Sequence, residues 1–410
     1  MADAAHDAAS AVDTIDATPR GLITVTVYGD GVDRNPGSPV PGANVYFVEP
    51  DHTVTNITTG MDGVATAQEP DNTTVWIVHR DGSSSYYIET YEGVLIGDSI
   101  TGGDPTPLGA DTVVGAAYVA FPSFSDATTY KLAVSCVGGY TPGSSSPIAP
   151  NFVACPKETT ANAIVWATDS MGNLGYTTAT GVDLTAHTSA STALTLPAFQ
   201  PGSTIGVTFT NLPSSMGESD ADIYARYTSG TDPTILQNVE LRENTLTDTM
   251  TASDSIAPFG DRTRVQGLVY ISAYAYAYNY DSTTAGLQSS LTIDASTMVH
   301  PLVAHTWLYD SASTSITWTQ LAFGVDPTVV QSYMSWNLGP SVAWRLTAPY
   351  AGGPSLPLPL IPSALASLMS SPSDAVYKEV DLTSYAGEVY HDVVVGHVAG
   401  AASWRIGVGS

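Results

Sequence analysis

The fold of this chain is decided near its N-terminus by the stretches LITVTVY (residues 22–28), PVPGANVYFV (39–48) and TTGMDGVATA (58–67). Each is rich in β-branched and aromatic residues, and Gly, Pro, Asn and Asp stand between them, which is typical of short strands joined by turns. The same pattern continues from Gly21 onward, and apolar residues rarely recur at helical spacing. The sequence therefore predicts an all-β fold.

The second and third stretches resemble the carboxypeptidase regulatory-like domain, a small transthyretin-like β-sandwich found in bacterial secreted and surface proteins. The matching residues are Gly42, Ala43, Val45, Thr59, Asp62 and Gly63. In that family the first element begins the second strand, and the second is a turn whose Asp and Gly supply side-chain-to-backbone bonds or positive φ. The resemblance covers residues 20–108. It implies a fold and a role as spacer or adhesive support, and no activity.

The chain is 410 residues long, which is more than one hydrophobic core usually serves. We therefore expect tandem small β-sandwiches followed by a larger β-sandwich or jelly-roll domain. VWIVHRDG (75–82) is echoed by VWATDSMG (165–172), and both predict hairpins. We place a flexible Ala/Asp-rich tether at 1–19, the regulatory-like sandwich at 20–108, a second small sandwich with a disulfide loop at 109–200 and the larger domain at 201–410.

Longer strands are predicted beyond Gly202. They cover residues 204–209, 223–227, 267–280, 289–293, 303–309, 315–321, 342–346 and 388–398. We expect a long Pro-rich loop over 349–362 and the only helical turns over 363–370. Leu365, Leu368 and Met369 would form the apolar face of those turns.

Composition limits the classes of partner. Only 12% of the residues are charged, against about a quarter in a typical soluble domain. The net charge of −27 arises from 39 acidic and 12 basic residues, and the basic ones form no cluster. Because phosphate binding needs clustered Lys or Arg, we expect no nucleic-acid partner. A halophilic cytoplasm is one setting for such a chain, but the β-rich Thr, Ser and Tyr patterning favours secretion.

Cys136 and Cys155 are the two cysteines, and Gly-rich and Pro-rich turns flank them. A disulfide between them would stabilise the fold by about 3 kcal/mol, because it closes a loop of about twenty residues. The alternative is a pair of reduced, buried thiols. A metal site is not indicated, since neither a CxxC motif nor clustered His accompanies them. A disulfide indicates an oxidising compartment.

The chain contains no run of eighteen apolar residues, so we expect no transmembrane segment. Residues 1–18 lack the basic start and apolar middle of a signal peptide and form a polar tract instead. We expect a mature chain whose export signal has been removed, located outside the cell or on the surface of a bacterial envelope. A lipid at the N-terminus is one way to tether it there.

The most unusual stretch is YISAYAYAYNY (270–280). In one continuous strand, a period of two places the tyrosines on one face and small residues on the other. Those tyrosines are Tyr270, Tyr274, Tyr276, Tyr278 and Tyr280. One interpretation is that the small face lies where two sheets approach closely. The other is an aromatic platform for a glycan or protein partner, because Tyr combines stacking area with a hydroxyl.

Asp30, Asp33 and Asn35 form the best local set of oxygen ligands for Ca²⁺, the one cofactor that the sequence suggests. They lack the twelve-residue grammar of an EF-hand and its closing Glu. The alternative is a solvated turn without a metal ion. We expect no other cofactor.

No HExxH, GxSxG, GxxxxGK[ST] or GxGxxG motif is present, so we expect no enzyme with a local signature. The first hypothesis is a non-catalytic surface protein for adhesion, envelope assembly or display, whose C-terminal domain binds a partner and whose edge strands permit self-association. The second is a carbohydrate-binding protein that uses the Tyr strand with Trp307, Trp318 or Trp336. The third is a secreted polysaccharide hydrolase, because scattered catalytic carboxylates leave no short motif.

Overall fold

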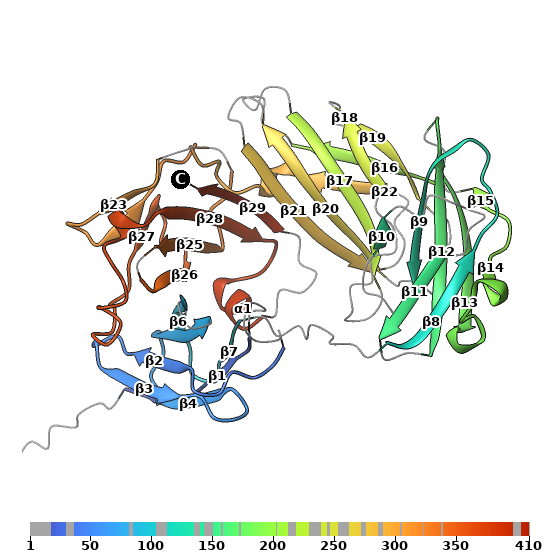
Figure 1. Cartoon of the computed structure of the whole chain (residues 1–410). Helices are drawn as coiled ribbons and strands as arrows, with labels where there is room; N and C mark the ends of the chain where they lie inside the picture. Colours follow the sequence, from blue (N-terminus) through green and yellow to red (C-terminus); the bar gives the residue numbers. More distant parts are fainter. Residues whose placement is uncertain are drawn as a thin grey trace, which may run out of the picture.

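The computed structural model of this chain consists mainly of β-strands arranged in several sheets (Figure 1), which confirms the predicted all-β fold class. It describes residues 18–29, 37–81, 85–103, 113–134, 140–142, 151–156, 159–171, 174–201, 203–211, 219–228, 239–243, 247–252, 262–271, 276–285, 290–303, 306–322, 324–337, 339–396 and 403–409. Because the strands alternate in side-chain direction, each sheet presents two faces that can bury different cores.

The largest sheet has twelve strands and contains elements from both ends of the chain. In spatial order these are β18 (Val239–Glu243), β17 (Ser219–Thr228), β20 (Arg262–Ile271), β21 (Tyr276–Ala285), β29 (Ser403–Gly409), β28 (Tyr377–Tyr385), β25 (Val329–Trp336), β26 (Ser341–Pro349), β6 (Ser85–Val94), β5 (Thr73–Asp81), β2 (Asn44–Val48) and β3 (Val54–Thr58). We call it the main sheet. Its strands pair antiparallel except β26 and β6, which pair in parallel.

At its N-terminal end the main sheet packs against a second sheet, formed by β4 (Val64–Glu69), β1 (Gly21–Val27) and β7 (Ser99–Gly102). Val25, Phe47 and Ile77 are fully buried between the two sheets. The predicted turn after β3 is also present: the Asp62 carboxylate accepts a bond from the Val64 N–H at 3.1 Å, and Gly63 has a φ of +74°. The strands predicted from the opening stretches are therefore confirmed, and the family resemblance stays a prediction.

The opposite face of the main sheet carries a second core, which extends from β2 through to β29. Its largest side chains are Trp76, Trp336 and Trp344, all fully buried. A small sheet of β23 (Leu308–Asp310), β24 (Ser315–Thr317) and β27 (Ser355–Pro357) contributes Ile316 and Leu356 to this core. Trp76 of β5 and Trp344 of β26 stack with ring centres 5.3 Å apart.

Residues from the two ends of the chain thus share one sheet and one core. Figure 1 shows the blue N-terminal strands on the same side of the molecule as the orange-to-red C-terminal strands. The hydroxyls of Ser85 and Ser341 form a hydrogen bond of 2.8 Å, and the Trp344 indole donates to the Thr90 hydroxyl at 2.9 Å. The domain boundaries proposed above stay a prediction. The prediction did not include the main sheet, which joins strands from the first unit (20–108) and the last unit (201–410).

The region between them begins with a second sandwich. One of its sheets contains β10 (Tyr140–Pro142), β9 (Ala127–Val134), β12 (Thr160–Asp169), β13 (Leu174–Asp183) and β15 (Gln200–Pro201), and the other contains β11 (Asn151–Pro156), β8 (Val113–Ala120) and β14 (Leu194–Thr195). The predicted hairpin at 165–172 is confirmed, because β12 pairs antiparallel with β13. Cys155 lies in β11 and Cys136 lies outside the described residues, so the disulfide stays a prediction.

A further sheet contains β19 (Thr247–Ala252), β16 (Ser203–Thr210) and β22 (Ser290–Asp294). The described helical segments are short: the 3₁₀ turns η1 (Leu184–Ala186), η2 (Ala190–Thr192), η4 (Ala295–Thr297) and η5 (Pro372–Asp374), and the α-helix α1 (Tyr390–Val394). Within the described residues, none of the helices is both long and apolar enough to cross a membrane.

The structure corrects the prediction of one continuous strand over 267–280. This part of the chain forms a hairpin of β20 and β21, in which Tyr270 pairs with Ala277 and Ile271 pairs with Tyr276. Strands in globular proteins usually have three to ten residues, so a run as long as this one must turn. Residues paired across an antiparallel ladder belong to the same face of the sheet. Because Tyr276 pairs with Ile271, the neighbour of Tyr270, the register assigns Tyr270 and Tyr276 to opposite faces.

The strand predicted over 388–398 is also wrong, because this segment contains α1. Asp392 accepts a bond from the Val389 N–H at 3.2 Å, which is the reciprocal contact that begins many helices, and Gly396 with a φ of +77° follows the helix.

The segment 363–370 consists of turns rather than a helix. Its predicted apolar face is confirmed, since Leu365 and Met369 are buried in the core and Leu368 packs against it. Strands β25, β28 and β29 were not predicted at all. They form the middle of the main sheet.

Candidate functional site

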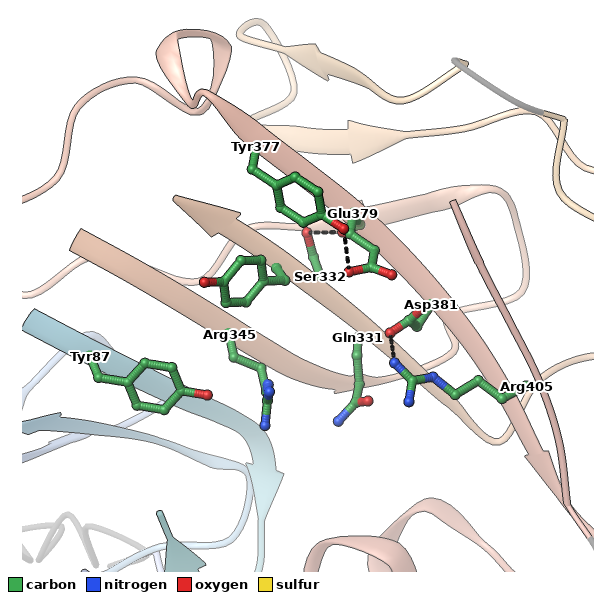
Figure 2. A pocket seen from close by; sticks show the side chains of 9 residues that line it. Tyr87, Gln331, Ser332, Arg345, Tyr377, Glu379, Asp381 and Arg405 are labelled. Carbon is green, nitrogen blue, oxygen red and sulfur yellow. Dashed lines mark hydrogen bonds and ion pairs between the residues drawn. The ribbon is translucent and has the colours of Figure 1, made fainter. Parts of the chain in front are cut away.

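A cavity of about 500 Å³ lies on the main sheet, on the face opposite the tryptophan core (Figure 2). Its lining comes from five neighbouring strands, β6, β26, β25, β28 and β29. The lining residues are Tyr87, Gln331, Ser332, Tyr333, Arg345, Tyr377, Glu379, Asp381 and Arg405. We call this the sheet cavity. All nine residues are polar, charged or aromatic with a hydroxyl, unlike a core surface.

Strand register brings the lining together. Tyr333 of β25 pairs with Arg345 on one side and with Glu379 on the other, and Gln331 pairs with Asp381. Side chains directly opposite in adjacent strands occupy the same face, and residues two apart on one strand do so as well. The alternation in β28 therefore places Glu379 and Asp381 next to each other on the cavity face.

The carboxylate side of the sheet cavity is partly neutralised. Arg405 of β29 forms an ion pair and hydrogen bond with Asp381 Oδ2, and the Tyr377 hydroxyl donates to Glu379 Oε2 at 3.0 Å. Asp381 is only 6% exposed, and its other oxygen, Oδ1, is buried without a hydrogen-bond partner. A buried acceptor without a donor costs free energy, which makes this carboxylate an unusual feature of the sheet.

Gly407 leaves room for that oxygen. It pairs with Asp381 in the ladder between β28 and β29. A Cβ on Gly407 would lie 2.0 Å from Asp381 Oδ1 and 3.0 Å from Glu379 Oε1. The Asp381 carboxylate therefore packs directly against the glycine, and Glu379 Oε1 lies close to the same point. We call Gly407 and these two carboxylates the carboxylate niche.

The electrostatics of the niche are set mainly by burial. The pKa of Asp381 is raised from 3.8 to about 6, because burial disfavours the charged form; Arg405 opposes this shift and Glu379 adds to it. The ionised form of the carboxyl group is the stronger acceptor for a hydroxyl donor.

The other side of the sheet cavity is aromatic. The Arg345 guanidinium lies 5.9 Å from the centre of the Tyr87 ring, and His79 packs edge-on against the same ring at 5.3 Å. Tyr333 and Tyr377 form an edge-to-face pair with ring centres 5.7 Å apart. Figure 2 shows Tyr87, Arg345 and Tyr377 around the same hollow as the carboxylates.

Two hydrogen bonds hold the floor of the cavity. The Ser332 hydroxyl donates to the Glu379 carbonyl at 3.1 Å, and the Gln331 amide donates to the Thr347 hydroxyl at 3.2 Å. Both bonds join adjacent strands of the main sheet. The site is therefore built on rigid elements, which favours a preformed binding geometry.

The site residues proposed from the sequence lie outside the sheet cavity or outside the described residues. Asp30, Asp33 and Asn35 are outside the described residues, so the Ca²⁺ site stays a prediction. In the described part of the chain no three His, Cys, Asp or Glu side chains gather in a metal-binding group. Tyr274 is also outside the described residues, and the remaining predicted tyrosines lie in β20 and β21. These are Tyr270, Tyr276, Tyr278 and Tyr280, and their ligand-binding role stays a prediction.

The three tryptophans proposed to assist binding are core residues. Trp336 is 1% exposed and donates to the Ser371 carbonyl at 3.1 Å, and Trp318 donates to the Gln320 side chain at 3.0 Å. Trp307 is 8% exposed, with the Lys378 ammonium 5.2 Å from its ring centre. Their rings fill the core behind the main sheet and present no platform.

The sheet cavity itself was missed at the sequence level. One local signal was present: YKEVDL, residues 377–382, alternates an aromatic and two acidic residues at period two. That alternation predicts a strand with one polar face. It does not reveal that Arg345 and Tyr87, from distant segments, complete the same surface.

The chain matches no protein-family model and no curated protein sequence. Among solved structures it is similar to the Bacillus anthracis TIE protein, with 7% identity over 67% of this chain and a TM-score of 0.16; the match spans half the length of that protein. It is also similar to a DUF3823 family protein from Parabacteroides merdae, with 10% identity, a TM-score of 0.16 and coverage of 37% of this chain and 91% of that one. A third is a candidate adhesin from Bacteroides ovatus, with 6% identity, a TM-score of 0.17 and coverage of 74% and 94%. At these TM-scores the similarities identify no family for this chain.

Proposed function

We propose that this protein is a non-catalytic surface protein that binds a glycan in the sheet cavity. The observation that carries the proposal is the carboxylate niche, because Glu379 and Asp381 both line the cavity and the buried Asp381 Oδ1 has no hydrogen-bond partner. Glu379 Oε1 lies close to the same glycine. A ligand with hydroxyl groups would supply the donors that the protein itself does not.

The chemistry of the lining matches a sugar. Hydroxyl groups donate to carboxylates and accept from guanidinium and amide groups, and all three kinds of group line this cavity. The apolar C–H face of a sugar ring packs on aromatic rings such as Tyr87, Tyr333 and Tyr377, whose own hydroxyls add polar contacts. The volume of about 500 Å³ lies within the range of about 300–1,000 Å³ that is usual for ligand sites.

Glycan binding is consistent with the composition of the chain. Low charge, abundant Ser, Thr and Tyr strands and the predicted disulfide all favour an extracellular setting, in which glycans are the prevalent polar ligands. Adhesion or envelope assembly would then be the biological role. The second sandwich would serve as a spacer, and self-association through edge strands stays a prediction.

The first test is a glycan array with the full chain, followed by isothermal titration calorimetry with the glycans that are retained. Asp381→Asn should weaken binding by about tenfold or more, because it removes one charged acceptor and the partner of Arg405. Asp374→Asn is the matched control, since Asp374 is exposed in η5 and is not part of the cavity lining.

Tyr377 allows the aromatic contribution to be measured separately, because it is 41% exposed and its loss should not unfold the sheet. Tyr377→Ala should weaken binding more than Tyr377→Phe, which keeps the ring and loses only the bond to Glu379. The proposal fails if the wild-type chain retains no glycan, or if Asp381→Asn binds as tightly as wild type. Release of sugar products by the wild-type protein would contradict the non-catalytic assignment.

A further inference from the structure

We infer that the glycan bound in the sheet cavity is acidic, and that Arg345 binds its carboxylate. This inference rests on the proposed function and names the class of sugar. A hexuronic acid unit carries hydroxyls and a carboxylate on one ring. Its hydroxyls would reach the carboxylate niche, its ring face would pack on a tyrosine, and its carboxylate would meet the guanidinium.

The first support is the difference between the two arginines of the cavity. Arg405 is held by Asp381, so its charge is neutralised within the protein. Arg345 is exposed, and among the described residues it forms no ion pair with a carboxylate. Its guanidinium lies over the ring of Tyr87 in a cation–π contact. One of the two cationic groups is therefore available to a ligand.

The residue best placed to neutralise Arg345 is engaged elsewhere. Glu89 of β6 is directly opposite Arg345 in the parallel ladder. It is only 4% exposed, and its Oε2 accepts a bond from the Gly103 N–H at 3.1 Å. The strand register would allow a cross-strand ion pair, but Glu89 is buried toward the N-terminal sheet instead.

Stacking on Tyr87 orients Arg345 for a carboxylate. A guanidinium that lies over an aromatic face keeps the N–H groups at its planar edge free. Those groups form two parallel bonds with a carboxylate, a geometry that lysine does not reproduce. The aromatic ring also limits the rotamers of the long side chain, so less entropy is lost on binding.

The charge of the whole chain makes a local cation necessary for an anionic ligand. The net charge is −27, and only 12 residues are basic. Two of those twelve, Arg345 and Arg405, line this one cavity. Long-range repulsion is screened beyond about 8 Å at physiological salt. A direct contact with Arg345 is therefore the means by which such a chain holds a carboxylate.

The test uses the full chain and pairs of oligosaccharides that differ in one group: an oligouronate and its carboxyl-reduced neutral counterpart. The wild-type chain should bind the oligouronate at least about tenfold more tightly than the reduced sugar, and added NaCl should weaken only the former. Arg345→Gln should remove that preference, because it should weaken binding of the oligouronate more than binding of the reduced sugar. Arg345→Lys should restore only part of it.

Arg80→Gln is the matched control, because Arg80 is another exposed arginine over a tyrosine, with its guanidinium 5.3 Å from the Tyr86 ring centre, and it does not line the cavity. It should retain the full preference. Equal affinity of wild type for the two sugars, or a preference that survives Arg345→Gln, would overturn this inference and leave glycan binding intact. Failure of both sugars and of the whole array would instead remove the proposed function.

Discussion

The substitution Gly407→Ala should displace the Asp381 carboxylate of the carboxylate niche. The added Cβ of Gly407→Ala would lie 2.0 Å from Asp381 Oδ1, so the carboxylate must retreat by roughly an ångström or more. The retreat is not free, because the Asp381 side chain is 9% exposed and Arg405 holds its other oxygen. Glu379 Oε1, at 3.0 Å, restricts the alternative direction.

The expected cost is that of overpacking a well-packed site, about 1–3 kcal/mol in the free energy of unfolding. The cost should fall toward the lower limit if Asp381 turns toward the cavity and into solvent. In either case the Asp381 carboxylate is displaced from its place in the cavity lining, so glycan affinity should fall by about tenfold or more. Urea denaturation measures the first quantity and calorimetric titration the second.

Gly353→Ala is the control for the effect of a Gly-to-Ala change as such, because a Cβ there meets nothing within 4 Å. Its unfolding free energy and its glycan affinity should both match wild type. The reasoning is refuted if Gly407→Ala also stays within about 0.5 kcal/mol of wild type and binds with unchanged affinity.

Three further outcomes follow from the same geometry. Trp344→Ala should lower the unfolding free energy by about 3–5 kcal/mol in urea denaturation, because it removes a fully buried ring stacked on Trp76, and a loss below about 1 kcal/mol would contradict the shared core. The folded pKa of Asp381, about 6, exceeds its unfolded value of 3.8, so its contribution to stability is present below pH 4 and lost as the pH rises through 6. The unfolding free energy of Asp381→Asn should therefore rise relative to that of wild type between pH 4 and pH 7, by roughly 2–3 kcal/mol. If the difference in unfolding free energy between the two proteins stays constant across that range, the pKa of Asp381 is not raised. Tyr390→Phe should cost about 1–2 kcal/mol in the same assay, because the Tyr390 hydroxyl bonds to the Glu92 and Thr347 carbonyls at 2.7 and 3.0 Å, and no loss would show that water replaces it.

The sequence predicts a strand correctly where the alternation of apolar and polar residues matches the alternation of buried and exposed positions in the fold. In β1 every second residue is buried, and the alternation LITVTVY predicts this directly. Strand β28 shows the opposite case: its polar residues Asp381, Thr383 and Ser384 are buried alongside its apolar residues, so the burial of this strand does not follow the alternation in its sequence. Its burial depends on neighbours at both edges, which the local sequence does not specify.

The cavity could not be predicted for a related reason. Its lining requires Tyr87 on β6 to stand beside Arg345 on β26, and these strands pair in parallel across 256 residues, as the bond between Ser85 and Ser341 shows. A parallel pair leaves no hairpin turn in the sequence to reveal it. The tyrosine run at 270–280 has a stronger local pattern than the cavity residues, so the sequence alone predicts a binding surface there.

The position of the sheet cavity follows from where the covering layers of the main sheet end. On one face, the sheet of β4, β1 and β7 covers Phe47 and Ile77, and its core extends no farther along the main sheet than the neighbourhood of Tyr91 on β6. The strands beyond, β26, β25, β28 and β29, bury their apolar side chains on the opposite face, among the tryptophans. Their free face must be polar, because an apolar surface of that extent would favour aggregation. The sheet cavity therefore lies where the N-terminal sheet no longer covers the main sheet, and the polar side chains of Arg345, Glu379 and Asp381 in its lining carry the proposed specificity.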